Sequence, residues 1–232
     1  MFNKRHIVRT IAATVSILAL SFTAACGSGQ STASNSADSD DITQQTYKPG
    51  KLTIATGQPA YEPWVMNDKP ESGEGYEAAV AYAVADKLGF KKSDVVWTRT
   101  AFDTAIAPGA KDWDFNIQQF GITDERKKAV DFSSSYYNDS QSVVVKKDSK
   151  FANATKVSDL KDATVGVMVG TLAYDYAKAN IKDDIQTFND DAALAPALDA
   201  GQIDALVTST VECVYMVQSE QVKDAKVLGR LP

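Results

Sequence analysis

Residues 163–179 read ATVGVMVGTLAYDYAKA, and this stretch indicates the class of fold. Its first seven residues are apolar or small apart from one threonine, which is typical of a buried strand. A glycine and a threonine then form a turn, and the residues from 172 to 179 predict a helix. A strand, a turn and a helix in direct succession form the repeating unit of an α/β fold.

The same alternation continues along the rest of the body in two successive groups. The first group comprises predicted strands at 51–56, 95–97 and 115–122 and predicted helices at 75–88 and 102–106. The second comprises predicted strands at 142–145, 163–169, 185–188 and 203–207 and predicted helices at 172–179, 190–199 and 210–217. We therefore predict an α/β fold of two lobes with mainly parallel sheets, lobe 1 at 50–139 and lobe 2 at 140–232. Ligands of such sheets bind beyond the carboxyl ends of the strands, so we expect a site in the cleft between the lobes.

One predicted strand, at 115–122, is irregular. Phe115 and Ile117 share one parity, whereas the later apolar residues of the strand share the other. The change falls at Gln118 and Gln119, where a bulge or the end of the strand would expose polar groups.

A leader peptide is predicted for residues 1–25. Three basic side chains precede an apolar run at 11–22, which is too short to span a bilayer comfortably and is followed by small residues. Cys26 comes directly after Ala-Ala and resembles the lipidated cysteine of a bacterial lipoprotein box. A plain signal peptide is the alternative.

Residues 26–49 predict a flexible tether, because they are rich in Ser, Asn, Gln and Asp and have almost nothing to bury. A lipidated residue, a tether and a globular body form the layout of a protein held at the outer face of a membrane. We therefore expect a lipid-anchored, extracytoplasmic protein.

The composition excludes several kinds of chemistry. The only histidine is His6, inside the leader, so the body has neither a Ser-His-Asp nor a Cys-His nucleophile. Cys213 is the only cysteine besides Cys26, which excludes an intramolecular disulfide and a Cys-rich zinc site. Cys213 lies in the apolar run VECVYMV and is predicted to be a small buried residue. We expect no metal and no cofactor.

The chain is acidic, with a formal net charge of −6, and the basic leader makes the body more acidic still. An acidic exported body is a poor candidate for binding nucleic acid. We expect a monomer that binds a small molecule, with any cationic pocket set against an acidic background.

Arg126 is the first candidate for holding a ligand. It follows Thr123, a plausible helix cap, just after the strand predicted at 115–122. A guanidinium in that position could bind a carboxylate with two hydrogen bonds. The alternative is a surface ion pair with Glu125 or Asp131, which would contribute little.

Two further stretches give weaker signals. The N–H groups after Gly170 and the hydroxyl of Thr171 could bind an anion, or could form an ordinary turn from strand to helix. Tyr61 and Trp64, in the loop YEPW, could pack on the core or stack on a ligand side chain.

Together these stretches resemble the bacterial family 3 solute-binding proteins, the amino-acid receptors of ABC importers, from about residue 51 to 232. The resemblance is carried by YEPW, GYEAAVAYAVADKLG, DFNIQQFGITDERKKAVDFSSSYY, VGVMVGTLAYDYAK and GQIDALVTST. It implies a two-lobed, periplasmic-binding-protein-like (type II) fold, joined by crossover strands and closing like a hinge around one amino acid. The implied partners are a polar amino acid and the permease subunits of an importer.

The resemblance also implies which residues touch the ligand. They are Arg126, Thr123, Gln119, Gly121, Tyr61, Trp64, Glu77, Gly170, Thr171, Leu172 and Ser209. Arg126 would bind the α-carboxylate together with the turn that begins at Gly170. Thr123 and the Gln119 carbonyl would face the α-ammonium or carboxylate, and the aromatic pair would line the side-chain pocket. Glu77 would contact the ligand or cap its helix.

The chain departs from the family pattern at three places. Ser209 stands where the family usually has an Asp that pairs with the ligand ammonium, a loss of about 1–2 kcal/mol or more. Gly121 stands where the family typically has Ser or Thr. The pattern would also continue past the last residue with a return strand and terminal helices. We therefore expect a C-terminally truncated or degenerate member whose sheet edge is uncovered.

Three functions follow as hypotheses. The first is a lipid-anchored amino-acid receptor of an importer. The second is a truncated or degenerate member with weak or no ligand binding. The third is a dehydratase of the same fold that acts on a prephenate-like carboxylate, with Arg126 holding the substrate and Glu77 as general acid.

Overall fold

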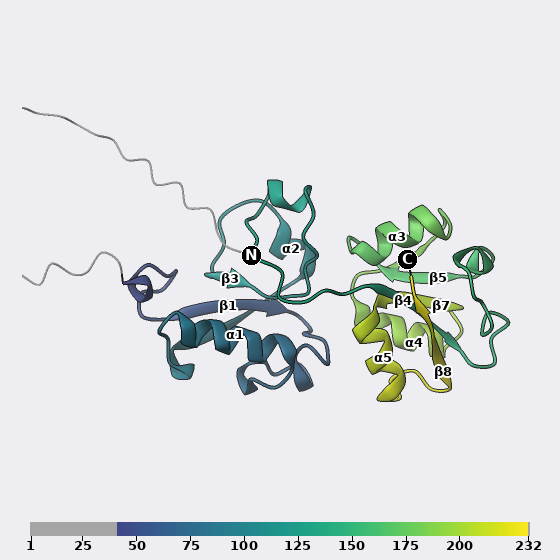
Figure 1. Cartoon of the computed structure of the whole chain (residues 1–232), viewed down its shortest axis with the longest axis horizontal. Coiled ribbons are helices and arrows are strands. Elements are labelled where there is room, and N and C mark those ends of the chain that lie inside the picture. Colours follow the sequence, from purple (N-terminus) through teal and green to yellow (C-terminus); the bar gives the residue numbers. More distant parts are fainter. Residues whose placement is uncertain (1–40, 232) are drawn as a thin grey trace, which may run out of the picture.

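The computed structural model describes residues 41–231, which form two lobes arranged along the long axis of the molecule (Figure 1). Each lobe has its own sheet, and the segment that leads into β4 (Gln141–Lys146) connects them. The leader and the lipidation site predicted at Cys26 lie outside the described residues. None of the helices within 41–231 is both long and apolar enough to cross a membrane.

Lobe 1 is built on a parallel sheet with the order β2-β1-β3. Its strands are β1 (Leu52–Gly57), β2 (Val95–Thr100) and β3 (Phe115–Asn116), and its helices are α1 (Tyr76–Lys87) and α2 (Phe102–Ile106). Apolar residues of β1, α1 and β3, and of the segments that directly follow α1 and β3, meet in a buried core: Leu52, Ile54, Ala81, Ala85, Phe90, Phe115 and Ile117. Burial of these side chains stabilises the lobe, because each apolar group leaves water.

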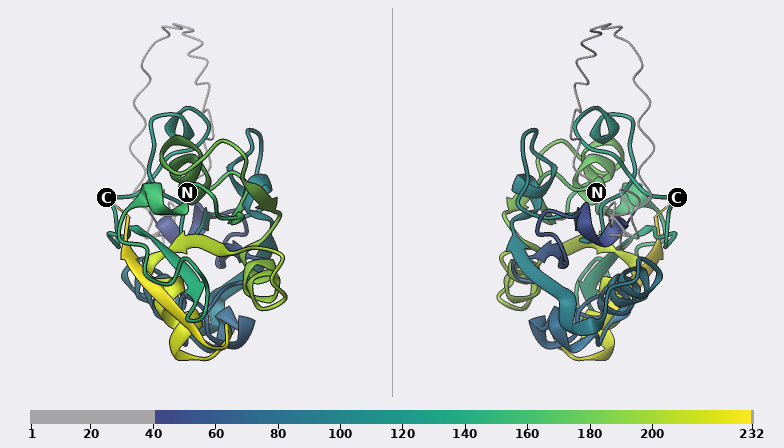
Figure 2. Two further views of the ribbon diagram at one scale, coloured as in Figure 1. Left: turned by 90° about the vertical axis from the view of Figure 1, so that its right-hand side faces the viewer. Right: turned by 90° about the vertical axis from the view of Figure 1, so that its left-hand side faces the viewer.

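Lobe 2 is built on a mixed sheet with the order β6-β5-β7-β4-β8. Its strands are β4, β5 (Val165–Met168), β6 (Gln186–Phe188), β7 (Ala205–Ser209) and β8 (Ala225–Arg230), and its helices are α3 (Leu172–Asn180), α4 (Leu194–Asp199) and α5 (Thr210–Gln218). β5 pairs in parallel with β6 and β7, whereas β4 pairs antiparallel with β7 and β8. Views along the long axis show β8 and β4 side by side at the edge of this sheet (Figure 2).

Short 3₁₀ helices connect these elements. They are η1 (Ile42–Gln44), η2 (Met66–Asp68), η3 (Pro70–Ser72), η4 (Lys92–Asp94), η5 (Arg126–Lys128), η6 (Val157–Leu160) and η7 (Asp191–Ala193).

The predicted α/β fold of two lobes with mainly parallel sheets is confirmed, with three corrections. The strand predicted at 115–122 is wrong in length, since β3 ends at Asn116 and Gln119 has a φ of +50°. The strand β8 was not predicted. Within residues 41–231 the chain passes between the lobes once.

The third correction concerns the tether predicted at 26–49, whose described part, from residue 41 onward, is folded against lobe 1. Asp41 accepts a hydrogen bond from the N–H of Thr43 at 2.9 Å and so caps η1. The backbone N–H of Tyr47 donates to Asp114 at 2.5 Å. These polar residues are ordered because their hydrogen-bonding groups find partners in the fold, which composition alone does not reveal.

Gly75 fixes the loop YEPW against the start of α1. Its φ is +100°, and a Cβ added there would lie 2.5 Å from the Trp64 carbonyl oxygen. The first N–H groups of α1 donate to this loop, from Tyr76 to the Pro63 carbonyl at 3.2 Å and from Glu77 to the Trp64 carbonyl at 2.9 Å. The loop is therefore held by orphan donors at the helix N-terminus.

We expect Gly75→Ala to lower the free energy of unfolding by about 2 kcal/mol or more, because it combines a strained φ with a backbone clash. Thermal unfolding followed by circular dichroism measures this as a loss of several degrees in Tm. Gly109→Ala is the matched control, since its φ is +123° but no described atom lies within 4 Å of the added Cβ. Equal losses for the two variants would contradict the argument.

Candidate functional site

A cavity of about 870 Å³ lies between the two lobes. Lobe 1 contributes residues that follow β1, β3 and η5, and lobe 2 contributes residues that follow β5, β6 and β7. The carboxyl ends of parallel strands from both lobes therefore face the same space, as expected for a ligand site in sheets of this kind. All the predicted ligand-binding residues line the cavity except Thr123 and Gly170.

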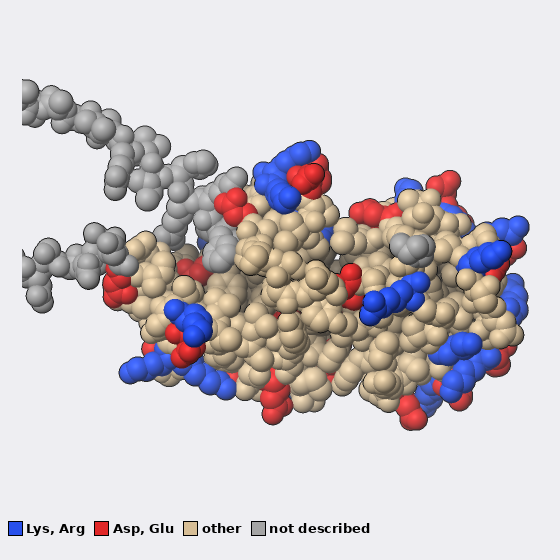
Figure 3. Space-filling model, in the orientation of Figure 1, with Lys and Arg blue, Asp and Glu red and all other residues tan. Residues whose placement is uncertain are grey.

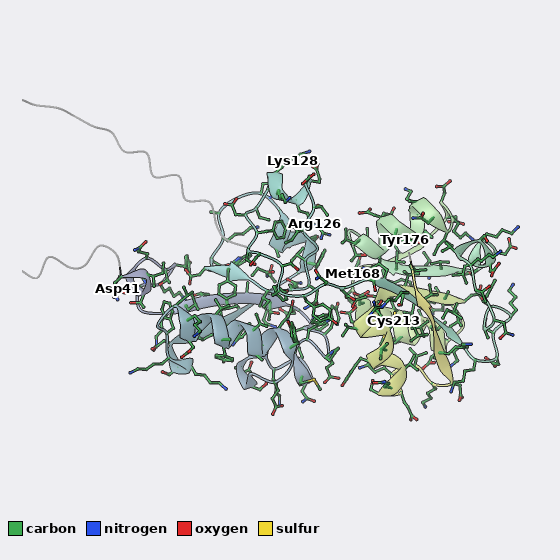
Figure 4. All side chains as sticks on the ribbon, viewed as in Figure 1. Asp41, Arg126, Lys128, Met168, Tyr176 and Cys213 are labelled. Atoms are coloured by element: carbon green, nitrogen blue, oxygen red, sulfur yellow. The ribbon has the colours of Figure 1, made fainter. Side chains whose placement is uncertain are left out.

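Arg126 reaches across from lobe 1 to lobe 2. Its Nη1 donates to the Gly121 carbonyl at 2.9 Å, and its Nη2 donates to the Gly170 carbonyl at 3.0 Å. Its guanidinium carbon lies 5.6 and 5.4 Å from the ring centroids of Phe102 and Phe120, which stack on each other. Figure 4 shows Arg126 on the side of lobe 1 that faces lobe 2, where Met168 lies.

Of the two acids considered above as surface partners of Arg126, Glu125 pairs with Lys128. Burial lowers the pKa of Arg126, and the charge of Asp175 opposes this change. The ordinary pKa of arginine lies so far above neutrality that the guanidinium stays charged. A charged, half-buried guanidinium beside a cavity attracts an anion.

Thr123 fixes the backbone of the turn that carries Arg126. Its hydroxyl oxygen accepts from the N–H of Arg126 at 3.1 Å, and its carbonyl accepts from the N–H of Lys127 at 3.0 Å. Thr123 thus closes the turn that leads into η5, whose N-cap is Glu125, and it lies outside the cavity lining. The contact with a ligand that the resemblance implied for Thr123 stays a prediction.

The turn between β5 and α3 supplies backbone donors from lobe 2. Thr171 is the N-cap of α3, and its hydroxyl accepts from the N–H of Tyr174 at 3.2 Å and donates to the Met168 carbonyl at 2.8 Å. The N–H groups of Leu172 and Ala173 have no acceptor among the residues described. They are the free donors that a helix N-terminus offers to an anion.

Gly121 of lobe 1 lies next to Leu172 of lobe 2. A Cβ added at Gly121 would lie 2.3 Å from Cδ1 of Leu172 and 3.5 Å from Nη1 of Arg126. The glycine that stands in place of the family's Ser or Thr therefore leaves room for a leucine of the other lobe.

The loop YEPW joins lobe 1 to lobe 2 through hydrogen bonds. Nε1 of Trp64 donates to Glu212 at 3.1 Å, and the hydroxyl of Tyr61 accepts from the N–H of Asp191 at 3.1 Å. The hydroxyl of Tyr215 donates to Glu62 at 2.8 Å. We call these three bonds the interlobe latch. Trp64 is 3 % exposed, so it is mostly buried between the lobes while part of it lines the cavity.

Glu77 is fully buried and organises the lobe 1 wall of the cavity. Its carboxylate accepts from the backbone N–H of Gln119 at 2.8 Å, from the Gln119 side chain and from the Tyr136 hydroxyl. Burial raises the pKa of Glu77, and these hydrogen bonds oppose the rise. The acid does not cap α1, because Gly75 is the N-cap and the side chain makes no capping bond.

Two buried acids of lobe 2 were missed in the sequence analysis. Asp191 is 7 % exposed and Glu212 is 3 % exposed, and both line the cavity. Thr208 donates to Glu212 at 2.7 Å. Burial raises the pKa of Glu212 well above its usual range, and the neighbouring charge of Asp191 raises it further. The signal in the sequence is an acid within the apolar run VECVYMV at 211–217.

Cys213 and Ser209, both singled out in the sequence, lie at the junction of β7 and α5. Cys213 is buried, as expected, with its Sγ 3.8 Å from the Thr208 carbonyl oxygen. Ser209 lines the cavity and caps α5 by accepting from the N–H of Glu212 at 3.4 Å. Within residues 41–231 no group of three or more His, Cys, Asp and Glu side chains is arranged to hold a metal ion.

A comparison with protein families places the chain. Residues 52–169 match the model of the bacterial extracellular solute-binding proteins, family 3. The chain belongs to this family. The predicted family is therefore confirmed.

Individual relatives are binding proteins by name. The chain is 28% identical to the L-arginine-binding protein of Pseudomonas aeruginosa over 197 residues, 78% of this chain and 73% of that one. It is 32% identical to the glutamine-binding protein of Geobacillus stearothermophilus over 225 residues, 88% of this chain and 82% of that one. It is 31% identical to the L-cystine-binding protein TcyJ of Escherichia coli over 160 residues, 68% of this chain and 59% of that one.

Solved structures confirm the type II fold. An ancestral arginine-binding protein bound to arginine superposes with a TM-score of 0.67 at 31% identity, over 78% of this chain and 80% of that one. An ancestral amino acid-binding protein, a precursor of cyclohexadienyl dehydratase, superposes with a TM-score of 0.67 at 30% identity, over 78% of each chain.

The buried acids predict how stability depends on pH. Burial, opposed by a hydrogen bond from Thr208 and reinforced by the charge of Asp190, raises the pKa of Asp191 to about 7. In the unfolded chain an aspartate has a pKa near 4. Between about pH 4 and 7 the folded state therefore holds a proton that the unfolded state has lost. The free energy of unfolding should fall as pH rises through this range, by up to about 1.4 kcal/mol per pH unit.

Asp191→Asn should flatten this dependence, because an amide does not titrate. Urea unfolding at several pH values between about 4 and 7.5 measures the slope for both proteins. Asp183→Asn, at an exposed position, is the control and should leave the slope unchanged. An identical slope for the wild type and Asp191→Asn would show that Asp191 does not carry the proton.

Proposed function

We propose that this protein is an extracytoplasmic receptor that closes its two lobes around an amino acid and delivers it to an ABC importer. The observation that carries the proposal is the meeting of Arg126 from lobe 1 with the turn before α3 from lobe 2, at a distance of 3.0 Å between Nη2 and the Gly170 carbonyl. The names of the relatives, which bind arginine, glutamine and cystine, support the same class of ligand.

The α-carboxylate of the ligand would lie between Arg126 and the N-terminus of α3. There it can accept charge-assisted hydrogen bonds from the guanidinium and from the N–H groups of Leu172 and Ala173. In this structure Arg126 donates to the carbonyls of Gly121 and Gly170, beside the position proposed for the ligand carboxylate. The aromatic side chains of Tyr61 and Trp64 line the cavity, where the side chain of the ligand would lie.

Closure and binding would be coupled through contacts that exist only when the lobes meet. Arg126 to Gly170 and the three bonds of the interlobe latch all join residues of different lobes. A ligand that bonds to both lobes adds to this set and shifts the equilibrium toward the closed form.

The location and partners belong to the same proposal. The leader and Cys26 support a lipid-anchored receptor at the outer face of the membrane. The permease subunits of an importer are the partner that a family 3 receptor implies, and we propose that the protein acts as a monomer that binds no nucleic acid.

The dehydratase reading is not favoured by the geometry of Glu77. Both oxygens of this acid accept hydrogen bonds, from Gln119 and Tyr136, and it has no exposed surface. A general acid must reach the substrate atom to which it gives a proton. We expect no turnover when the protein is incubated with prephenate or arogenate and the absorbance is followed; a rate that Glu77→Gln abolishes would establish the enzyme instead.

Arg126→Ala tests the receptor directly. We expect the variant to lose at least about 100-fold in affinity for whichever amino acid binds, because it removes a charge-assisted, bidentate contact. A thermal-shift screen over the proteinogenic amino acids finds the ligand, and isothermal titration of the wild type and the variant gives the ratio of Kd values.

Arg230→Ala is the control for charge, since Arg230 is exposed on β8 and lies outside the cavity. It should bind the ligand as tightly as the wild type. A cooperatively folded wild type that binds no amino acid would instead support the alternative of a degenerate family member.

A further inference from the structure

The charge of the cavity is unbalanced. Its acidic lining residues are Glu77, Asp139, Asp190, Asp191 and Glu212, and Arg126 is the only Lys or Arg among the described residues that line it. On the face shown in Figure 3, basic and acidic side chains are interspersed over both lobes. In the cavity lining, by contrast, acids outnumber basic side chains by five to one, and clefts lined by one sign of charge concentrate ligands of the other.

Asp191 and Glu212 are the acids for which this excess is most costly. Both are more than nine-tenths buried, and no ion pair within residues 41–231 includes either of them. The hydrogen bonds to Glu212 come from uncharged groups, the indole of Trp64 and the hydroxyl of Thr208. Two adjacent buried carboxyls without a cation must hold a proton or receive a cation from outside.

The acid pair lies on the lobe 2 wall of the cavity, beyond the strands that flank β5. Arg126 lies beside the turn that follows β5, whereas Asp191 follows β6 and Glu212 follows β7. The hydrogen bonds of Arg126 go to the carbonyls of Gly121 and Gly170, and none of them reaches Asp191 or Glu212. The pair therefore does not neutralise Arg126 through a direct contact.

The surroundings of the pair suit an organic cation. Tyr61 and Trp64 line the same part of the cavity and are bonded to the Asp191 backbone and to Glu212. Aromatic rings attract ammonium and guanidinium groups through their faces, and carboxylates accept their hydrogen bonds. The volume of about 870 Å³ leaves room for a long side chain.

We infer that the cavity selects an amino acid whose side chain carries a cation, an ammonium or a guanidinium, and that Asp191 and Glu212 bind this group while Arg126 binds the α-carboxylate. The inference rests on the proposed function and specifies its ligand. A ligand with a carboxylate and a side-chain cation matches the guanidinium and the acid pair that line the cavity, and a neutral side chain of the same shape leaves the acids uncompensated.

Citrulline tests the inference, because it has nearly the shape of arginine but no side-chain charge. Isothermal titration of the wild type with arginine, lysine and citrulline should give a Kd for arginine or lysine at least about 10-fold lower than that for citrulline. Citrulline or glutamine binding as tightly as the cationic amino acids would overturn the inference and leave the proposed function intact. The absence of binding by any amino acid to folded protein would overturn both.

Glu212→Gln tests the residue. It keeps the size of the side chain and an acceptor for Trp64 but removes the charge, so the preference for arginine over citrulline should fall by about 10-fold or more. Asp191→Asn should act in the same direction and serves if Glu212→Gln melts below the assay temperature. Glu220→Gln, an exposed acid beyond α5, is the matched control and should keep the wild-type ratio. An unchanged ratio in both cavity variants would overturn the assignment of the pair.

Proton release provides a readout that a structural role would not change. A bound cation favours the ionised pair, so arginine should expel protons from the protein near neutral pH, whereas citrulline should not. The groups facing the pair are Asp139, Asp190, Cys213, Tyr61, Trp64 and Thr208. Titration in two buffers of different ionisation enthalpy counts the protons; equal counts for the two ligands would contradict the inference.

Discussion

The guanidinium of Arg126 donates one hydrogen bond to a carbonyl of each lobe, and the geometry of the cavity depends on that bridge. The same guanidinium is partly buried and lies near the rings of Phe102 and Phe120. Burial lowers its pKa, but it stays charged. A group that both joins the lobes and attracts an anion can couple closure to binding. A ligand that contacts this group and lobe 2 together favours the conformation in which the lobes meet. Thr123 holds the bridge in place by capping the turn on which Arg126 lies.

The interlobe latch is a second set of hydrogen bonds that join the two lobes. The loop YEPW carries its lobe 1 end, and that loop is held in turn by the N–H groups of α1 and by the close approach of Gly75. Trp64 and Tyr61 therefore have fixed positions from which to reach Glu212 and the backbone of Asp191. In this structure the lobe 1 side of the latch is thus held by its own backbone contacts as well as by lobe 2.

The sequence predicted the two lobes and most of their elements because strand–turn–helix periodicity is local. It predicted Arg126 because the residues around it, at 114–137, resemble the family pattern. It did not predict the ordering of residues 41–49, whose partners such as Asp114 lie far along the chain. It also did not predict the acid pair, because the burial of Glu212 depends on Trp64, 148 residues away. When a polar group is buried by residues far along the chain, the local sequence shows only an acid among apolar neighbours, as at Glu212.

The departures from the family pattern fit one another in space. Gly121 has no side chain, and Leu172 of the other lobe fills the place where a Cβ would lie. Ser209 has no charge, but its hydroxyl caps α5 and so positions Glu212, one helical turn later, at the cavity wall. An acid is thus present on this helix, where it accepts from Trp64 of the other lobe. At both positions the departing residue is matched by a contact in this structure, because Leu172 occupies the space beside Gly121 and Ser209 caps the helix that carries Glu212.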